Sequence, residues 1–355
     1  MKKLGLNLAV GLMAAVLIAP AFADNGSTSA GNTDSSTATV PLQIVPVGKN
    51  YKVGITVSVA GGPPTLLTFD TGGVGLHIYA SQVGNQNIRY TGQKIESSFG
   101  SAQTGFSFQG EIAYAPVTIG GITTQPIPIL VIQNVHCRSG NSCGFDMSGN
   151  APPMFGSFYG ELGAGMRLEA HGKTKLYTPF RALPGNYGSG FIIENLNPNS
   201  GTGQLVLGLT PQNSAGFNKV QLPQEGVMPN GSAQAVYNDK GLMVNYSVGN
   251  VSQTWRTAFD TGGDANVNLF TGKLAGVPSA RRNHMVRPGT PFEASLNNAF
   301  DWQFTTGREE GVNAVKMLPT IDNRPPYVNT GLLFFFNYNV MYDFNSGMLG
   351  FQQQS

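Results

Sequence analysis

The sequence LLTFDTGG at residues 66–73 ends in a pentapeptide, Phe-Asp-Thr-Gly-Gly, that returns in TAFDTGG at residues 257–263. Each copy closes an apolar run. A single copy would indicate only the turn that follows a strand, because Asp, Thr and Gly all favour that bend. Two copies in equivalent places of two half-chains indicate symmetry-related loops, so we expect Asp70 and Asp260 to face each other between two lobes.

The repeat extends beyond the pentapeptide. Candidate strands follow the two copies at residues 76–80 and 267–270. Further along, YGELG at 159–163 and YVNTG at 327–331 each place a glycine four residues after a tyrosine. The stretch LPGNYG at 183–188 separates the two halves, because Pro and Gly interrupt regular structure. We therefore predict two similar lobes.

Strand signals run through most of the chain. Short segments rich in β-branched and aromatic residues are bounded by Gly, Pro, Asn or Ser, and the chain holds 47 Gly and 22 Pro. The run LLFFFNYNVMYDF at 332–344 is one such segment, with the turn of a closing hairpin at 345–347. Long helical periodicity is absent. We expect a mainly β, bilobal fold with an N-terminal lobe over 41–186, a C-terminal lobe over 187–355 and a cleft between them.

The N-terminus has the layout of an export signal. Two lysines are followed by an apolar stretch over residues 8–19 and by Ala-Phe-Ala at 21–23, which predicts a cleaved signal peptide over residues 1–23. An uncleaved membrane anchor is the alternative, but the apolar run is short for a bilayer span. Residues 24–40, rich in Ser, Thr, Gly and Asn, are predicted to form a disordered leader. We therefore expect a periplasmic or secreted protein without a membrane anchor.

Charge is sparse along the chain. Asp, Glu, Lys and Arg make up 11% of the residues and the formal net charge is +2, which gives no electrostatic basis for binding nucleic acid. The four histidines form no metal-ligand spacing. We expect a monomer that needs no metal and no cofactor.

Two cysteines, Cys137 and Cys143, lie in the sequence HCRSGNSC. In an exported protein a close pair in a Gly/Ser/Asn loop is most simply a disulfide. A redox or metal-binding pair is the alternative, but the spacing is longer than CxxC and no further ligands accompany it.

A close pair of carboxyl groups has a particular chemistry. Two like charges within a few ångströms cannot both ionise easily, so the pair shares one proton and its two apparent pKa values move apart. One carboxylate then acts as a base and the other carboxyl as an acid. A water molecule held between them can lose a proton while it attacks a carbonyl carbon.

On these residues the chain resembles the pepsin-like aspartic proteases, and within them a bacterial, exported member. In that family each lobe carries a hydrophobic-hydrophobic-Asp-Thr-Gly motif, which LTFDTG at 67–72 and TAFDTG at 257–262 match. The resemblance implies that Asp70 and Asp260 are the catalytic pair and that no covalent intermediate forms. It implies that the residues supporting the pair are Thr71, Gly72, Thr261 and Gly262.

The chain departs from the family pattern in several features: the element at 328–331 is more polar than the family's, the leader has no basic residue, and two departures lie next to the aspartates. The residue after Asp-Thr-Gly is usually Ser or Thr, whose hydroxyl hydrogen-bonds the outer carboxylate oxygen, whereas Gly73 and Gly263 offer no hydroxyl. We expect these oxygens to lose a donor and the lower apparent pKa of the pair to rise, an effect that Gly73→Ser should reverse. The hairpin expected to cover the pair offers Phe99 and Gly100 near its tip instead of a tyrosine.

Two functions from different classes follow. The first is an aspartic endopeptidase that acts on extended polypeptide. The second is a non-catalytic scaffold that keeps the fold to bind a protein or a component of the cell envelope. Aspartates in both lobes favour the first, because a scaffold gains nothing from two buried carboxyl groups that cost desolvation energy.

Overall fold

Strands dominate the structure, which is a computed structural model of the chain. It describes residues 36–100, 105–137, 147–148, 151–229, 231–279, 284–309, 311–321 and 324–355. These residues belong to one compact unit, residues 34–355. The predicted signal peptide, most of the predicted leader and Cys143 lie outside the described residues.

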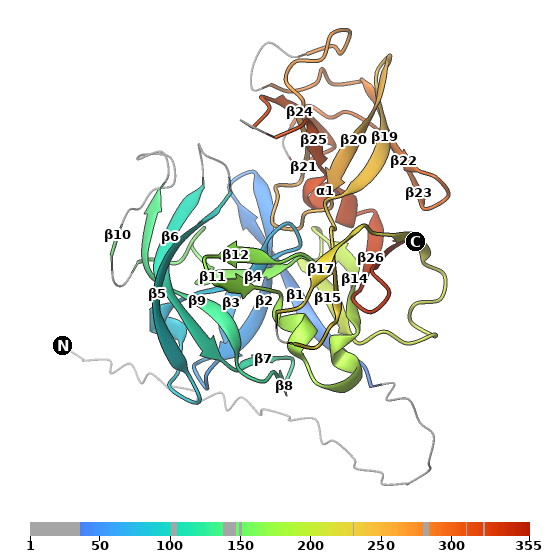
Figure 1. Cartoon of the computed structure of the whole chain (residues 1–355). Coiled ribbons are helices and arrows are strands. Elements are labelled where there is room, and N and C mark those ends of the chain that lie inside the picture. The colour runs from blue at the N-terminus through green and yellow to red at the C-terminus, as the bar shows by residue number, and fades with distance from the viewer. Residues whose placement is uncertain are drawn as a thin grey trace, which may run out of the picture. The chain divides into compact units, whose positions relative to one another are not determined.

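The larger sheet takes strands from both halves of the chain (Figure 1). Its strands from the first half are β1 (Ala38–Val47), β2 (Asn50–Val59), β3 (Thr65–Asp70), β4 (Val74–Tyr79), β5 (Arg89–Phe99), β6 (Phe106–Ala115), β7 (Val117–Ile119), β8 (Ile122–Thr123), β9 (Ile127–Cys137), β10 (Met147–Ser148) and β11 (Gly160–Ala164). Those from the second half are β14 (Gly190–Asn197), β15 (Thr202–Leu207), β16 (Asn218–Gln221), β26 (Tyr338–Asp343) and β27 (Met348–Gln353). The order along the sheet is β16-β27-β26-β14-β15-β1-β2-β3-β11-β4-β9-β6-β5, so β1 and β15 join the two halves.

A second sheet is built entirely from later residues. Its strands are β19 (Leu242–Val248), β20 (Val251–Ala258), β21 (Asn266–Phe270), β22 (Pro291–Leu296), β23 (Phe300–Thr305), β24 (Ala314–Leu318) and β25 (Tyr327–Asn329), in the order β23-β22-β19-β20-β25-β21-β24. The remaining elements are the hairpins β12 (Glu169–His171) with β13 (Thr174–Leu176) and β17 (Gln224–Val227) with β18 (Ala235–Tyr237), the 3-10 turns η1 (Ala80–Gln82), η2 (Pro179–Ala182) and η3 (Gly185–Gly188), and the helix α1 (Gly331–Phe335). The lobe boundary predicted at 186/187 falls in η3 and stays a prediction.

The two sheets repeat one arrangement around the pentapeptides. In the larger sheet β11 pairs in parallel with β3 and antiparallel with β4, and β4 pairs in parallel with β9. In the smaller sheet β25 pairs in parallel with β20 and antiparallel with β21, and β21 pairs in parallel with β24. The candidate strands at 76–80 and 267–270 are confirmed as β4 and β21. The internal repeat of the sequence is therefore a repeat of strand pairing.

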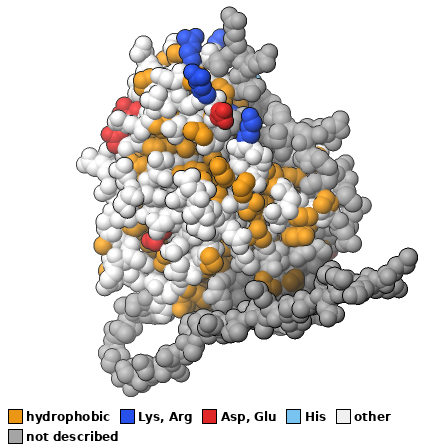
Figure 2. Space-filling model, turned by 180° about the vertical axis from the view of Figure 1, so that it is seen from behind, with side chains coloured by type: hydrophobic (Ala, Val, Ile, Leu, Met, Phe, Trp, Pro, Cys, Tyr) orange, Lys and Arg blue, Asp and Glu red, His pale blue; other side chains and the backbone are white. Residues whose placement is uncertain are grey.

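Side-chain alternation explains which faces these strands bury. In β1 the residues Val40, Leu42 and Ile44 point into the core while their neighbours are more exposed, as period-2 patterning requires. All six residues of β4 are buried because this strand lies inside the sheet with both faces covered. On the face shown in Figure 2, hydrophobic side chains are scattered among uncharged polar groups.

Two sequence expectations need correction. Strand β1 begins at Ala38 and pairs with β15, so the predicted leader over 24–40 extends three residues too far. The segment 332–336 was expected to be part of a strand, but most of it lies in α1, whose five residues are all buried. A short run that is apolar on every side has no period, so sequence alone cannot separate a buried strand from a buried helical turn. The hairpin of β26 and β27 with its turn at 345–347 is as predicted.

Cys137 ends β9 and is 8% exposed, whereas its predicted partner lies outside the described residues. We expect the exported protein to contain the Cys137–Cys143 disulfide, with a contribution to stability of about 2 kcal/mol because the closed loop is small. Intact mass before and after reduction and alkylation checks this. Two thiols that react with alkylating reagent in the denatured, unreduced protein would exclude the bond.

Candidate active site

Both pentapeptide aspartates lie where a strand ends. Asp70 is the last residue of β3, and Asp260 follows the end of β20 by two residues. The preceding residues, Phe69 and Phe259, are buried and each packs against several aromatic rings. Burying a phenylalanine contributes up to about 3 kcal/mol, so each loop is fixed to the core immediately before its carboxyl group.

The threonines of the two pentapeptides bind the loops to each other. The backbone N–H of Thr71 donates to Thr261 Oγ1 and that of Thr261 donates to Thr71 Oγ1, both at 3.0 Å. Each hydroxyl also donates at 2.7 Å to the opposite segment, Thr71 to the carbonyl of Phe259 and Thr261 to the carbonyl of Phe69. Both threonines are buried. These four bonds hold the two aspartates at a set separation.

The glycines allow the carboxyl groups to approach the opposite loop. A Cβ atom on Gly72 would lie 2.5–2.8 Å from the carboxyl atoms of Asp260, and one on Gly262 would lie 2.2–2.5 Å from those of Asp70. Any side chain there would displace an aspartate. The carboxyl group of each aspartate therefore packs against the glycine of the opposite loop.

The pair is poised to hold a proton. Burial raises the pKa of Asp70 well above its usual range, and the charge of Asp260 raises it further; Glu161, when ionised, acts in the same direction. Lys240 acts in the opposite direction. Two carboxyl groups this close share a proton, so the pair as a whole titrates in two separate steps.

Backbone donors serve the inner oxygens of the pair. Asp70 Oδ1 accepts from the N–H groups of Gly72 at 2.6 Å and Gly73 at 2.9 Å. Asp260 Oδ1 accepts from the N–H of Gly263 at 3.0 Å. These bonds favour the ionised form of one member of the pair and fix the planes of both carboxyl groups.

Because Gly263 has no hydroxyl, the outer oxygen of Asp260 was expected to lack a hydrogen-bond donor. This expectation is wrong. Asn329 Nδ2 donates to Asp260 Oδ2 at 2.5 Å, and Asn329 Oδ1 accepts from the N–H of Gly331 at 2.9 Å, which fixes the orientation of the amide. Asn329 is the third residue of the YVNTG repeat. A side-chain amide from β25 therefore takes the part that a hydroxyl after Asp-Thr-Gly plays in the family pattern.

Two buried titratable residues lie behind Asp70 that sequence reasoning did not single out. Glu161, in β11, is 3% exposed and His77, its cross-strand neighbour in β4, is 2% exposed. Glu161 Oε2 lies 3.4 Å from His77 Nδ1, and neither ring nitrogen has a hydrogen-bond partner in the described part of the chain. Burial lowers the pKa of His77 and raises the pKa of Glu161 to about 8.

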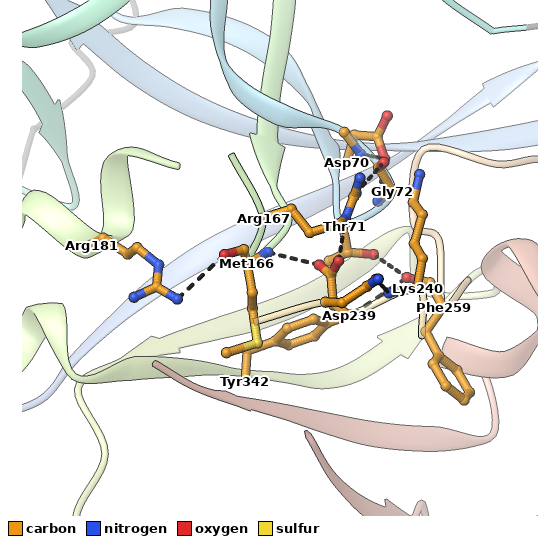
Figure 3. Close-up of polar contacts among 12 residues, drawn as sticks. Asp70, Thr71, Gly72, Met166, Arg167, Arg181, Asp239, Lys240, Phe259 and Tyr342 are labelled. Carbon is orange, nitrogen blue, oxygen red and sulfur yellow. Dashed lines mark hydrogen bonds and ion pairs between the residues drawn. The ribbon is translucent and has the colours of Figure 1, made fainter. Parts of the chain in front are cut away.

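An ion pair links the residues after β11 to those after β18 close to the aspartates (Figure 3). Arg167 Nε donates to Asp239 Oδ1 at 2.5 Å, and the backbone N–H of Met166 donates to Asp239 Oδ2 at 2.7 Å. Arg167 Nη2 reaches the carbonyl of Gly72 at 3.1 Å. Asp239 is buried, and these donors compensate its charge together with the nearby charges of Lys240 and Arg181.

Two lysines place positive charge near the aspartate loops. Lys52, on β2, donates to the carbonyl of Gly262 at 2.7 Å and to Asp264 Oδ1 at 3.1 Å. Lys240 is partly buried and lies near both aspartates, and its charge lowers the pKa of Asp70. A single lysine, whether on a strand as Lys52 is or in a loop as Lys240 is, gives no sequence signal, so neither residue could be predicted.

The flap candidates lie at the end of the β5–β6 pair. Phe99 is the last residue of β5 and is 5% exposed, with its ring centroid 6.5 Å from that of Phe106 and 6.1 Å from that of Phe155. Gly100 follows with φ +80°, a conformation that favours glycine. Residues 101–104 lie outside the description. Contact of Phe99 with a substrate stays a prediction.

Comparisons with solved structures identify the fold. Of many similar chains, the crystal structure of aspartic proteinase from Irpex lacteus superimposes with a TM-score of 0.61, covering 90% of this chain and 98% of that one at 17% sequence identity. The chain thus has the bilobal, mainly β pepsin-like aspartic proteinase fold, as predicted. No family model and no curated protein matches the sequence.

Two further properties concern the described residues alone. No helix among them is long and apolar enough to span a membrane. Nor do they contain a group of three or more His, Cys, Asp or Glu side chains arranged to hold a metal ion.

Proposed function

We propose that this protein is an aspartic endopeptidase that hydrolyses polypeptide bonds with water activated by Asp70 and Asp260. The observation that carries the proposal is the pair itself: two carboxyl groups from equivalent loops, each packed against the glycine of the opposite loop, with the charge of Asp260 acting on Asp70. The likeness to the Irpex lacteus aspartic proteinase supports the same reaction class.

The geometry suits direct attack by water. In the proposed reaction the ionised member of the pair takes a proton from a water molecule as its oxygen attacks the peptide carbonyl carbon. The protonated member donates its proton to the carbonyl oxygen. A tetrahedral diol forms. The carboxyl group that took the proton from water then gives it to the nitrogen, the C–N bond breaks, and one diol hydroxyl returns a proton to the other carboxylate. The backbone donors and Asn329 hold both carboxyl planes in place during these transfers.

The arrangement favours hydrolysis over a binding scaffold. Burial raises the pKa of Asp70, so a pair kept without catalytic use would cost stability. The threonine bonds, the glycine contacts and the amide of Asn329 all serve the carboxyl groups, and a scaffold has no need for them. Export to the periplasm or the medium, and a monomeric state, remain predictions from the sequence.

A peptide library tests the proposal. Purified protein lacking residues 1–23 is incubated with the library from pH 3 to pH 8, with and without a statine-type inhibitor, and new termini are identified by mass spectrometry. We expect cleavage within the chains that the inhibitor suppresses. Folded protein that leaves the library intact at every pH would overturn the proposal.

Asn329 gives a prediction about pH. Its amide donates to an outer oxygen of the pair and so favours the form of the pair that carries a negative charge, and Asn329→Leu should therefore raise the lower apparent pKa of the pair. The acidic limb of kcat/KM should move to higher pH by about one unit, since a hydrogen bond to a charged group contributes about 1.5 kcal/mol and one pKa unit corresponds to about 1.4 kcal/mol. Asn218→Leu is the control, because Asn218 is exposed and its amide donates to the carbonyl of Ala299, which belongs to neither aspartate loop. An unchanged limb in Asn329→Leu would show that this amide does not tune the pair.

A further inference from the structure

Glu161 occupies the same place beside Asp70 that Asn329 occupies beside Asp260. In the parallel pair of β11 and β3, Glu161 lies opposite Thr68, two residues before the aspartate. In the parallel pair of β25 and β20, Asn329 lies opposite Ala258, again two residues before the aspartate. The two positions are equivalent in the internal repeat, and one of them already supplies a donor to an outer oxygen.

The carboxyl group of Glu161 fills the space that a side chain at residue 73 would need. A Cβ atom on Gly73 would lie 2.0 Å from Glu161 Oε1 and 3.1 Å from Asp70 Oδ2. Both atoms lie beside the same point, so the carboxyl groups of Glu161 and Asp70 are close to each other. Since the N–H groups of Gly72 and Gly73 both go to Asp70 Oδ1, Oδ2 is the oxygen that faces Glu161.

The charges around Glu161 disfavour a negative carboxylate there. Burial is the largest effect on its pKa and raises it, the interaction with the Asp70 side chain lowers it, the charges of Glu169 and Asp260 raise it, and Lys240 lowers it, with a net rise to about 8. The groups that face this carboxyl are Asp70 from β3, His77 from β4, Glu169 from β12, and Asp260 and Lys240 from the second half. Glu169 in turn is 3.0 Å from His171.

We propose that Glu161 carries a proton at neutral pH and donates it in a hydrogen bond to Asp70 Oδ2, in the place of the hydroxyl that Gly73 lacks. Glu161 is then a positioning residue that acts through Asp70, and the proposal rests on the proposed function. It corrects the expectation that Asp70 has lost its outer donor. It also corrects the expectation for Gly73→Ser, because the new side chain would collide with Glu161.

Removal of Glu161 should shift the acidic limb of kcat/KM, and the direction of that shift shows whether Glu161 is protonated. A neutral donor favours ionised Asp70, so Glu161→Val should raise the lower apparent pKa of the pair and move the acidic limb of kcat/KM up by about one pH unit. An anion at Glu161 would repel ionised Asp70, and its removal would move the limb down. A downward shift or an unchanged limb would overturn the proposal.

Two companion variants separate hydrogen bonding from packing. Glu161→Gln keeps an N–H donor of similar size, so its acidic limb should stay close to that of the wild type. Glu161→Val with Gly73→Ser should return the limb towards the wild-type position, because the shorter valine opens the space beside Asp70 Oδ2 for a hydroxyl. Gly73→Ser alone should lower activity through the collision. Failure of the double variant to restore the limb, in a folded protein, would count against the proposal.

A titration that needs no turnover keeps this proposal separate from the proposed function. In protein with ¹³C-labelled glutamate carboxyl groups, the Glu161 resonance is the one missing from Glu161→Gln. Its midpoint should lie near pH 8, far above the ordinary value of about 4.3 for glutamate. A midpoint below about 6 would show an ionised Glu161 and overturn the proposal. Absence of proteolysis with a midpoint near 8 would instead refute the proposed function alone.

Discussion

Asp70→Asn and Asp260→Asn are each expected to lower kcat/KM for peptide hydrolysis by several orders of magnitude while the fold stays intact. The two carboxyl groups act as one unit that shares a proton, so removing either takes away the base or the acid. An amide preserves size and can still accept the N–H bonds of the loop glycines. Steady-state kinetics on a peptide found in the library assay checks the loss.

Asp343→Asn is a matched control for these variants. Asp343 ends β26 and accepts hydrogen bonds within the 345–347 turn, so its substitution should leave turnover close to that of the wild type. Circular dichroism and thermal unfolding establish that each variant is folded. Near-normal turnover in either Asp70→Asn or Asp260→Asn would show that this aspartate is structural and that a two-carboxyl mechanism fails.

Gly262→Ala is expected to have the next largest effect. The added Cβ would lie 2.2 Å from Asp70 Cγ, and two threonine bonds hold the loop that carries it, so the Asp70 carboxyl must move. We expect activity to fall by about 100-fold or more, since small misplacements of reacting groups have such effects. The free energy of unfolding should fall by about 1–3 kcal/mol, as in other overpacked sites.

Gly226→Ala is the control for Gly262→Ala, because it makes the same glycine-to-alanine change away from the aspartates. Gly226 lies in β17, its φ is not in the left-handed region, and nothing lies within 4 Å of a Cβ added there. This variant should match the wild type in activity and in unfolding temperature. If Gly262→Ala also matched the wild type, the opposite loop could not lie against the Asp70 carboxyl as described.

Much of this site could be predicted from the sequence because its signal is local and duplicated. Each pentapeptide carries its aspartate, its threonine and its glycine within a few residues, and strand patterning places both at strand ends. The repeat of YGELG and YVNTG indicated, in addition, that the two halves are similar. The mainly β, bilobal fold followed from these features together with the distribution of Gly and Pro.

Other parts of the site depend on contacts that no local pattern records. Glu161 and Asn329 lie beside the aspartates only because β11 and β25 pair in parallel with the strands that carry them. The sequence shows that no hydroxyl follows Asp-Thr-Gly. It does not show that Glu161 and Asn329, each more than 65 positions away, stand in its place. The pairing of Arg167 with Asp239 is equally non-local.

Hydrolysis of one library peptide in H₂¹⁸O, with a primary amine added as a trap, tests the central claim most directly. Direct attack by water activated between Asp70 and Asp260 predicts that each new carboxyl terminus carries one ¹⁸O atom, that no amine adduct forms, and that neither Asp→Asn variant gives product. Amine adducts would reveal an acyl-enzyme, and labelled product from both variants would show that the carboxyl pair does not activate the water. Either result would contradict the account.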